Sequence, residues 1–262
     1  MRHAAVRLAV PLVGYGLLVS VWALAATQYL PVQLPRPGLV LEAIRDNFWS
    51  APGLKLQGLQ GGYASNLAYT TVSTLLAFFV ASPLGFAVGM LSARLQRFRD
   101  ISAPLLLLFA TVPELVAAPF LLIWFGPGRL AQAILVGFYC FVIVAVAAQN
   151  AALRIAPEYE EFGATLGASA GRRFFTIVVP GSLPAVIGGL RIALAVSWSL
   201  QCASELLGSE VGVGRVIVLS QQLGYTPGII AIILLVGLIA VACDRLLAGA
   251  LRWSARWQEA VV

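Results

Sequence analysis

Few side chains in this 262-residue chain could carry out catalysis or bind a metal. His3 is the only histidine, and the three cysteines, Cys140, Cys202 and Cys243, each lie in an apolar run without metal-ligand spacing. Such cysteines are typical of small buried residues, so we interpret them as part of the core. The sequence contains no recognisable pairing of a nucleophile with a general base. These observations argue against an enzyme, including one that works inside a membrane.

The sequence also lacks the phosphate-binding loop of common ATPases. That loop places Gly-Lys before Ser or Thr, because backbone amides and the lysine together hold the phosphates. The only lysine, Lys55, follows Leu54 and precedes Leu56. The chain therefore cannot contain that ATP site, and we expect it to bind no cofactor of its own. If ATP drives its function, the hydrolysis must take place on another polypeptide.

Two acidic residues stand out because their surroundings are apolar. Glu114 falls near the middle of residues 101–125, and Glu205 near the end of residues 184–207. A carboxylate at bilayer depth costs at least about 2.5 kcal/mol, so Glu114 should face a cavity or a partner rather than lipid. It is either a pathway residue or a neutral, hydrogen-bonded packing residue. Glu205 is a second pathway candidate, but a structural hydrogen bond to the Gly-rich turn after it is the favoured interpretation.

The composition predicts an all-α integral membrane protein. Hydrophobic residues make up 60% of the chain and charged residues 11%, and the mean hydropathy is +0.90. Soluble domains carry about 25% charged residues, and a spanning helix needs about 20 apolar residues. The predicted spans are residues 8–27, 67–93, 101–125, 130–153, 184–207 and 228–251. We expect residues 1–262 to form a single domain, in which Gly85 and Gly89 let another helix approach closely.

The basic residues predict which loops are cytoplasmic. With the N-terminus inside, twelve of the 17 basic residues lie in or near the cytoplasm and five lie outside. Cytoplasmic loops of membrane proteins carry such an excess, so we predict that both termini are cytoplasmic. The net charge of +6 follows from these loops and does not indicate a nucleic-acid partner.

Residues 156–181 form the longest polar interruption in the second half of the chain. Pro157 suits a first helical position, and the acids after it suit the positive end of a helix dipole. Gly167 is typical of a helix stop, and Ser169 can cap a second short helix. Pro180 should end that second helix. The pattern therefore predicts two short helices bent at a glycine.

The first of these helices has one apolar face. Tyr159, Phe162 and Leu166 fall at helical spacing. That face either packs on the rest of the chain or is offered to a partner. Gly163 and Gly167 are small enough for a partner surface to approach closely.

The same stretch resembles the EAA loop of bacterial ABC-importer permeases. That motif is Glu-Ala-Ala, three residues, Gly, nine residues, Ile, one residue and Leu-Pro. The positions that match in register are Glu161, Gly167, Ile177 and Pro180. Phe162 and Gly163 replace the two alanines, and Val179 replaces leucine. The resemblance implies that the loop is a coupling helix in a groove of an ATPase subunit. The coupling residues that it implies are Glu161, Phe162, Gly163, Gly167, Ile177 and Pro180.

Other phrases look like the nitrate, sulfonate, taurine and bicarbonate branch of these permeases, among them Ile123-Trp-Phe-Gly126 and Glu205-Leu-Leu-Gly208. The resemblance implies a type I ABC-importer transmembrane domain, MetI-like, that passes a small polar, anionic solute through a bacterial inner membrane. The implied partners are an ATPase subunit that holds ATP and Mg, an extracytoplasmic solute-binding protein, a second copy of the chain and the lipid bilayer. Several members of the branch carry an arginine before the proline that Pro113 matches. Here Val112 takes that place and Glu114 follows, a departure that makes an anionic solute a weaker prediction.

An ion-coupled secondary transporter is the alternative function. It would need several ionisable groups at mid-membrane, and only Glu114 clearly qualifies. We also find no internal repeat of the kind that inverted-repeat transporters contain.

Overall fold

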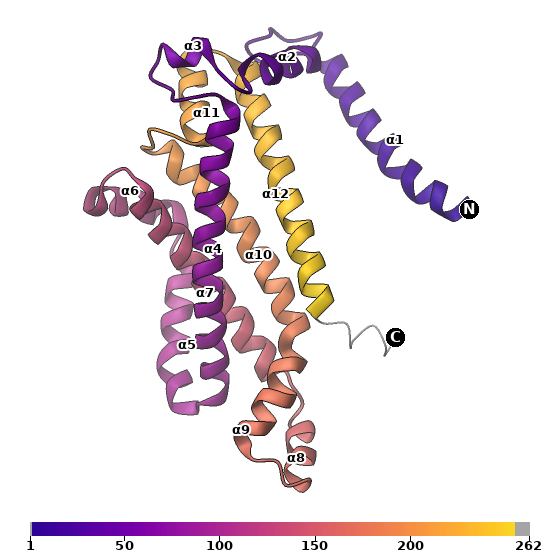
Figure 1. Ribbon diagram of the computed structural model, residues 1–262, viewed down its shortest axis with the longest axis vertical. Helices are drawn as coiled ribbons and strands as arrows, with labels where there is room; N and C mark the ends of the chain where they lie inside the picture. Colours follow the sequence, from indigo (N-terminus) through magenta and orange to yellow (C-terminus); the bar gives the residue numbers. More distant parts are fainter. Residues whose placement is uncertain (1, 255–262) are drawn as a thin grey trace. The chain divides into compact units, whose positions relative to one another are not determined.

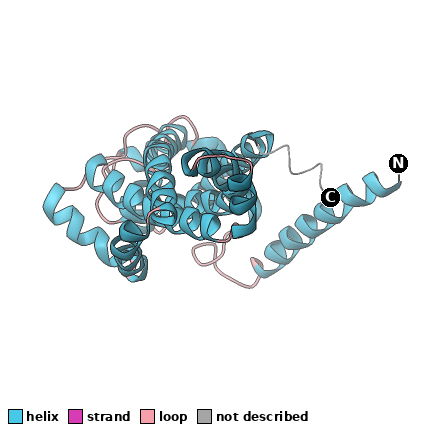
Figure 2. Cartoon of the chain, turned by 90° about the horizontal axis from the view of Figure 1, so that it is seen from below, coloured by secondary structure: helices cyan, strands magenta, loops and turns pink. Residues whose placement is uncertain are grey.

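The computed structural model describes residues 2–254, with side chains for residues 13–114 and 116–251. Within that part of the chain every regular element is a helix, and loops join the helices (Figure 1 and Figure 2). The elements are α1 (Arg2–Ala25), α2 (Pro37–Asn47), α3 (Pro52–Lys55), α4 (Tyr63–Arg94), α5 (Gln96–Thr111), α6 (Glu114–Phe125), α7 (Arg129–Leu153), α8 (Pro157–Thr165), α9 (Ala170–Arg173), η1 (Phe174–Val178), α10 (Val179–Leu206), α11 (Val213–Gln222) and α12 (Thr226–Ser254). The predicted all-α fold is confirmed.

Among the described residues, four helical segments are long and apolar enough to cross a membrane. They are Tyr63–Arg94, Arg129–Leu153, Ala170–Leu206 and Thr226–Leu251. A fifth span results if Gln96–Thr111 and Val116–Phe125 count as one, although these pieces are bent by 99°. The first predicted span falls on α1, whose described apolar part is Val13–Ala25. The count of six spans stays a prediction.

The smaller compact unit comprises residues 2–69 and 210–237, and a buried amide holds its loops together. Asn66 Nδ2 donates to the carbonyl oxygens of Gln60 at 3.0 Å and Gly62 at 2.8 Å. Its Oδ1 accepts from the N–H of Gly212 at 2.7 Å. Because these carbonyl and amide groups are satisfied inside the protein, the start of α4 and the loop before α11 keep a fixed conformation.

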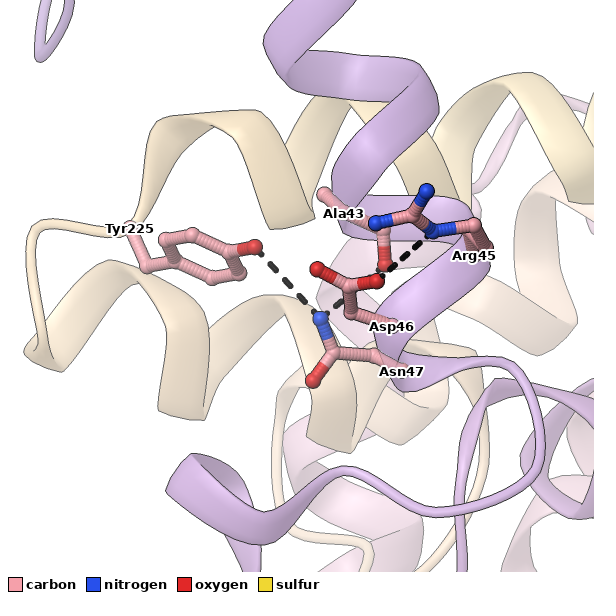
Figure 3. Close-up of polar contacts among 5 residues, drawn as sticks. All are labelled: Ala43, Arg45, Asp46, Asn47 and Tyr225. Atoms are coloured by element: carbon pink, nitrogen blue, oxygen red, sulfur yellow. Dashed lines mark hydrogen bonds and ion pairs between the residues drawn. The ribbon is translucent and has the colours of Figure 1, made fainter.

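A second amide in this unit links α2 to the segment before α12, as Figure 3 shows. Asn47 Nδ2 donates to the carbonyl oxygen of Ala43 at 3.0 Å and to the hydroxyl of Tyr225 at 3.4 Å. Burial raises the pKa of Tyr225, so its hydroxyl stays protonated at neutral pH. The neighbouring Arg45–Asp46 ion pair, at 3.0 Å, contributes little to stability because both side chains are exposed to solvent.

The larger unit comprises residues 70–209 and 238–254, and α7 is its most buried helix. Leu135, Val136 and Tyr139 of α7 pack with Leu200 of α10 in one apolar cluster. The short helices α8 and α9, which form the polar segment predicted above, follow α7 in the chain and lead back into α10. The packing of α7 against α10 therefore positions this segment.

Small residues bring α4 against α7. A Cβ at Gly85 would lie 2.5 Å from the carbonyl oxygen of Phe141, and a Cβ at Gly89 would overlap the carbonyl oxygen of Ala145. Real side chains never approach backbone atoms so closely, so both positions need glycine. The predicted close approach through this glycine pair is confirmed.

We predict that Gly89→Ile destabilises the larger unit, because the new side chain must push α4 away from α7. Overpacking of this kind costs about 1–3 kcal/mol. Gly237→Ile is the matched control, because a Cβ there meets nothing within 4 Å. Thermal unfolding of the detergent-purified protein should show a lower midpoint for Gly89→Ile alone. Equal midpoints for the two variants would contradict the packing described above.

Candidate functional site

The segment after α7 begins with the short helix α8. Pro157 takes its first position, as predicted, and Ala156 before it has extended backbone (φ −62°, ψ 130°). Glu158 and Glu160 lie in the first turn, where the positive end of the helix dipole stabilises carboxylates. A helix of 9 residues is marginal on its own, so packing must hold it in place.

α8 rests on the helical segment behind it through Gly163 and Ile177. Gly163 is buried, and a Cβ there would lie 2.9 Å from Ile177 Cδ1. Arg173 Nη1 adds a hydrogen bond of 3.1 Å to the carbonyl oxygen of Glu160. The expectation that a partner approaches Gly163 is wrong, because this glycine faces the chain's own helix. Its small size, and Ile177 opposite it, position α8 instead.

α8 ends in a turn that depends on Gly167. The N–H of Gly167 donates to the carbonyl oxygen of Ala164 at 2.9 Å, and that of Ala168 to the carbonyl oxygen of Gly163 at 3.0 Å. These two bonds are the Schellman motif, which requires a left-handed residue after the helix. Gly167 has a φ of +81°, a conformation that L side chains rarely adopt. The predicted helix stop is confirmed, and Gly167 is exposed to solvent.

The predicted apolar face of α8 points away from the rest of the chain. Tyr159 is 65% exposed, Phe162 67% and Leu166 72%. Glu161 beside them is also exposed. Neighbouring large apolar side chains that stay in solvent on a short helix are typical of an interaction surface. Of the two interpretations of this face, the structure supports the one in which it is offered to a partner.

The second short helix does not end at Pro180, contrary to the prediction. Ser169 caps α9 as predicted, since its side chain accepts from the N–H of Arg172 at 3.4 Å. α9 then continues through the π-helical turn η1 into α10, so that Ala170–Leu206 is continuous. In the π turn the N–H of Val179 bonds back to Phe174 rather than to Phe175. This wider turn shifts the hydrogen-bond register just before Pro180, which has no N–H to contribute.

Glu114 lies at a break between two half-helices rather than inside a continuous span. α5 ends at Thr111, Val112 and Pro113 are extended, and Glu114 begins α6. Tyr139 donates its hydroxyl to the carbonyl oxygen of Val112 at 3.3 Å and so satisfies one main-chain group that the break leaves open. The Glu114 side chain is half-buried, and no hydrogen bond to its carboxylate occurs among the described residues. The neutral packing interpretation therefore lacks the hydrogen bond that it requires.

Glu205 has a different environment, since it is 1% exposed inside the larger unit. Its carboxylate accepts from the Thr70 hydroxyl at 2.9 Å and from Gln201 Nε2 at 2.8 Å. Gln201 Nε2 also donates to Gln132 Oε1 at 3.1 Å. A structural role for Glu205 is supported, but through partners on α4 and α10 that sequence reasoning missed, and the hydrogen bond to the Gly-rich turn stays a prediction. Polar residues inside apolar runs, such as Thr70 and Gln201, are the sequence signal that could have indicated these partners.

Comparison with known proteins agrees with this geometry. The family model of the binding-protein-dependent transport system inner membrane component matches residues 81–256. The taurine transport system permease TauC of Escherichia coli (strain K12) is 31% identical over 229 residues, 85% of this chain and 80% of TauC. The putative aliphatic sulfonates transport permease SsuC of Bacillus subtilis (strain 168) is 25% identical over 186 residues, 71% of this chain and 67% of SsuC. The bicarbonate transport system permease CmpB of Synechococcus elongatus is 25% identical over 202 residues, 75% of this chain and 73% of CmpB.

Among solved structures, the inward-facing MetNI methionine ABC transporter contains a chain of similar fold. The TM-score is 0.54 at 20% sequence identity, over 70% of this chain and 95% of that chain. The predicted MetI-like transmembrane fold is confirmed.

We predict that Glu205→Leu destabilises the protein far more than Glu205→Gln. Leucine would remove the carboxylate to which the Thr70 hydroxyl and the Gln201 amide donate, and a hydrogen bond to a charged group contributes about 1.5–3 kcal/mol. Glutamine keeps an acceptor of the same shape. In thermal unfolding the midpoint should fall by about 2–4 °C for each kcal/mol lost. If both variants unfolded at the wild-type temperature, these bonds would not hold the helices together.

Proposed function

This chain belongs to the family of binding-protein-dependent transport inner membrane components, permeases that work with an ATPase and a binding protein, and on that premise we propose that it forms the translocation pathway of an ATP-driven importer. The solute is small, polar and anionic, of the sulfonate, nitrate, taurine or bicarbonate type. The names of TauC, SsuC and CmpB support this class, because taurine, sulfonates and bicarbonate all carry an oxyanion group. An external binding protein delivers the solute.

The observation that carries the proposal is the exposed apolar face of α8. Tyr159, Phe162 and Leu166 are about two-thirds exposed on a helix fixed from behind by Gly163 and Ile177. A rigid helix with apolar anchors fits a groove, which is a common mode of helix recognition. We assign that groove to the ATPase subunit, which would hold ATP and Mg. This chain supplies the docking helix and no cofactor.

The orientation follows from the distribution of arginines. The chain is a multi-pass inner-membrane protein, and an ATPase partner requires α8 in the cytoplasm. Twelve of the 17 basic residues lie on that side if both termini are cytoplasmic. The charge bias and the position of the docking helix therefore support the same orientation, although they are independent features.

Two copies of the chain would enclose one pathway. Large apolar side chains at the end of α6 are exposed, with Ile123 at 80% and Trp124 at 68%. These side chains are available to lipid or to a second copy. In such a dimer, closure of the ATPase pair would move both docking helices and switch the pathway between outward and inward openings.

Glu114 is the pathway residue of this proposal. It stands at the break between α5 and α6, half-buried, without the hydrogen bonds that a packing role would need. Broken helices at membrane depth occur where backbone lines a cavity or is covered by protein. An ion-coupled secondary transporter would need further free acids, and Glu205 is engaged by Thr70 and Gln201.

The test of the docking assignment is Gly167→Val against Gly167→Asn. Valine is strained at a φ of +81°, whereas asparagine tolerates the left-handed region, so only valine should distort the end of α8. We expect Gly167→Val to insert normally but to lower solute-stimulated ATP hydrolysis and uptake together, by at least about tenfold, or 1.4 kcal/mol. Gly167→Asn should stay close to wild type. Full coupled transport by Gly167→Val in the purified permease–ATPase complex would remove α8 from the coupling pathway.

Replacement of Glu114 separates the pathway role from packing. Glu114→Leu should leave complex yield and thermal stability unchanged, because the carboxylate bonds no described group. Uptake of radiolabelled solute into vesicles should fall by about tenfold or more if the acid contacts the solute or its water. Glu114→Gln, which keeps polarity and size, should retain more uptake than Glu114→Leu. Unchanged uptake in both variants would refute the pathway role.

A further inference from the structure

A polar cavity lies between α8 and the ends of the spanning helices, and docking of α8 on an ATPase gives this cavity no role. Its volume is about 460 Å³. Arg94 at the end of α4, Glu160 of α8 and Arg173 of α9 line its polar part, and Phe174 lies beside them. Ala152 and Val178 contribute to an apolar wall. A cavity that joins two guanidinium groups to an apolar wall can hold an amphiphilic anion.

The guanidinium of Arg94 is oriented by an aromatic ring. Its Cζ lies 4.9 Å from the centroid of the Phe174 ring, which is within the range of a cation–π interaction. Stacking occupies a face of the guanidinium plane and leaves its N–H edges available for hydrogen bonds. Among the side chains that the structure describes, residues 13–114 and 116–251, Arg94 forms no ion pair with a carboxylate.

Arg173 has one hydrogen-bonding nitrogen in use and one that is buried without a partner among the described residues. Its Nη1 donates to the main-chain oxygen of Glu160 at 3.1 Å. Its Nε is buried and has no partner among the described residues. In Arg191 of the same chain, Nε and Nη2 bond both oxygens of Asp244, at 2.8 and 2.7 Å. The Nε of Arg173 therefore lacks the charged acceptor that the same atom has in Arg191.

We propose that the cavity binds a phosphate-bearing anion, namely the phosphodiester headgroup of an anionic phospholipid from the inner leaflet. Arg94 and Arg173 would hold the phosphate oxygens, and the apolar wall would cover the first carbons of the acyl chains. Glu160 and Glu161 also line the cavity, so its net charge is near zero and a singly charged phosphodiester fits better than a polyanion. The proposal rests on the cytoplasmic orientation of α8 proposed above.

Occupancy of this site would influence coupling. Arg173 and Phe174 belong to the continuous helix that leads into α10, and Glu160 belongs to α8. A headgroup between them would fix the angle at which α8 meets the ATPase. A bound anionic lipid would thereby affect coupling directly, in addition to the solvent role of the bilayer.

The experiment compares Arg94→Gln with Arg97→Gln in the permease–ATPase complex. Arg97 is an exposed arginine of α5 that does not line the cavity, so its replacement removes the same charge from the same side. Native mass spectrometry counts phosphatidylglycerol retained by each complex after delipidation. ATP hydrolysis is measured in nanodiscs of phosphatidylcholine with and without phosphatidylglycerol. Arg94→Gln should retain about fivefold less phosphatidylglycerol and lose its stimulation of hydrolysis, while Arg97→Gln should behave as wild type.

Glu160→Gln is a second variant, and it leaves the guanidinium groups of Arg94 and Arg173 in place. Loss of a neighbouring negative charge should increase phosphatidylglycerol retention, which a misfolded variant would not do.

Equal retention by Arg94→Gln and wild type, or equal loss in both arginine variants, would overturn the proposal. Restored hydrolysis in phosphatidylcholine on addition of millimolar inorganic phosphate would support the phosphate site but assign it to a free anion. Weaker ATPase association of Arg94→Gln in every lipid would mean that the ATPase fills the cavity.

Failure of the proposed importer function would give a different result. In that case the permease would bind no ATPase, and hydrolysis would be absent in all lipids. Phosphatidylglycerol retention by the permease alone would still report on the cavity. The lipid site and the transport function are therefore tested separately.

Discussion

A bilayer offers no hydrogen-bond partners to the backbone, and this constraint explains most of the fold. It requires each spanning segment to be helical, and it makes each interruption depend on a specific polar group. At the break between α5 and α6, Tyr139 bonds the carbonyl oxygen of Val112. At the start of α4, Asn66 bonds two carbonyl oxygens and one amide of the neighbouring loops. At these two places a polar side chain satisfies main-chain groups where the backbone departs from a helix.

The same constraint makes close packing the main source of specificity between spans. Lipid tails are as apolar as leucine, so apolar burial gives helices little reason to associate with one another rather than with lipid. Gly85 and Gly89 let the α4 and α7 backbones approach, and the Glu205 bonds to Thr70 and Gln201 connect α4 with α10. Shape and a few buried hydrogen bonds, rather than hydrophobicity, therefore determine which helices are neighbours.

Features that depend on one or two neighbouring residues could be predicted from the sequence. Pro157 begins α8, Gly167 ends it and Ser169 caps α9, because each role follows from local backbone chemistry. Features that depend on residues distant in the chain could not. The contact of Gly163 with Ile177 and the partners of Glu205 arise from how helices pack. The predicted helix end at Pro180 is wrong for a related reason, since a π turn upstream changes which N–H groups the helix needs.

The continuity of Ala170–Leu206 bears on how docking at α8 could act on the membrane-spanning segments. If Pro180 ended a helix, a loop would connect α9 to α10, and that loop would absorb a displacement of α8. Ala170–Leu206 is instead one continuous helix of 37 residues, about 55 Å long at 1.5 Å per residue. α8 is fixed to its beginning through Gly163 and Ile177, and Glu205 ties its end to α4. A displacement of α8 would therefore act on one continuous helix whose far end is bonded through Glu205, so this helix can connect the docking helix to the membrane-spanning core.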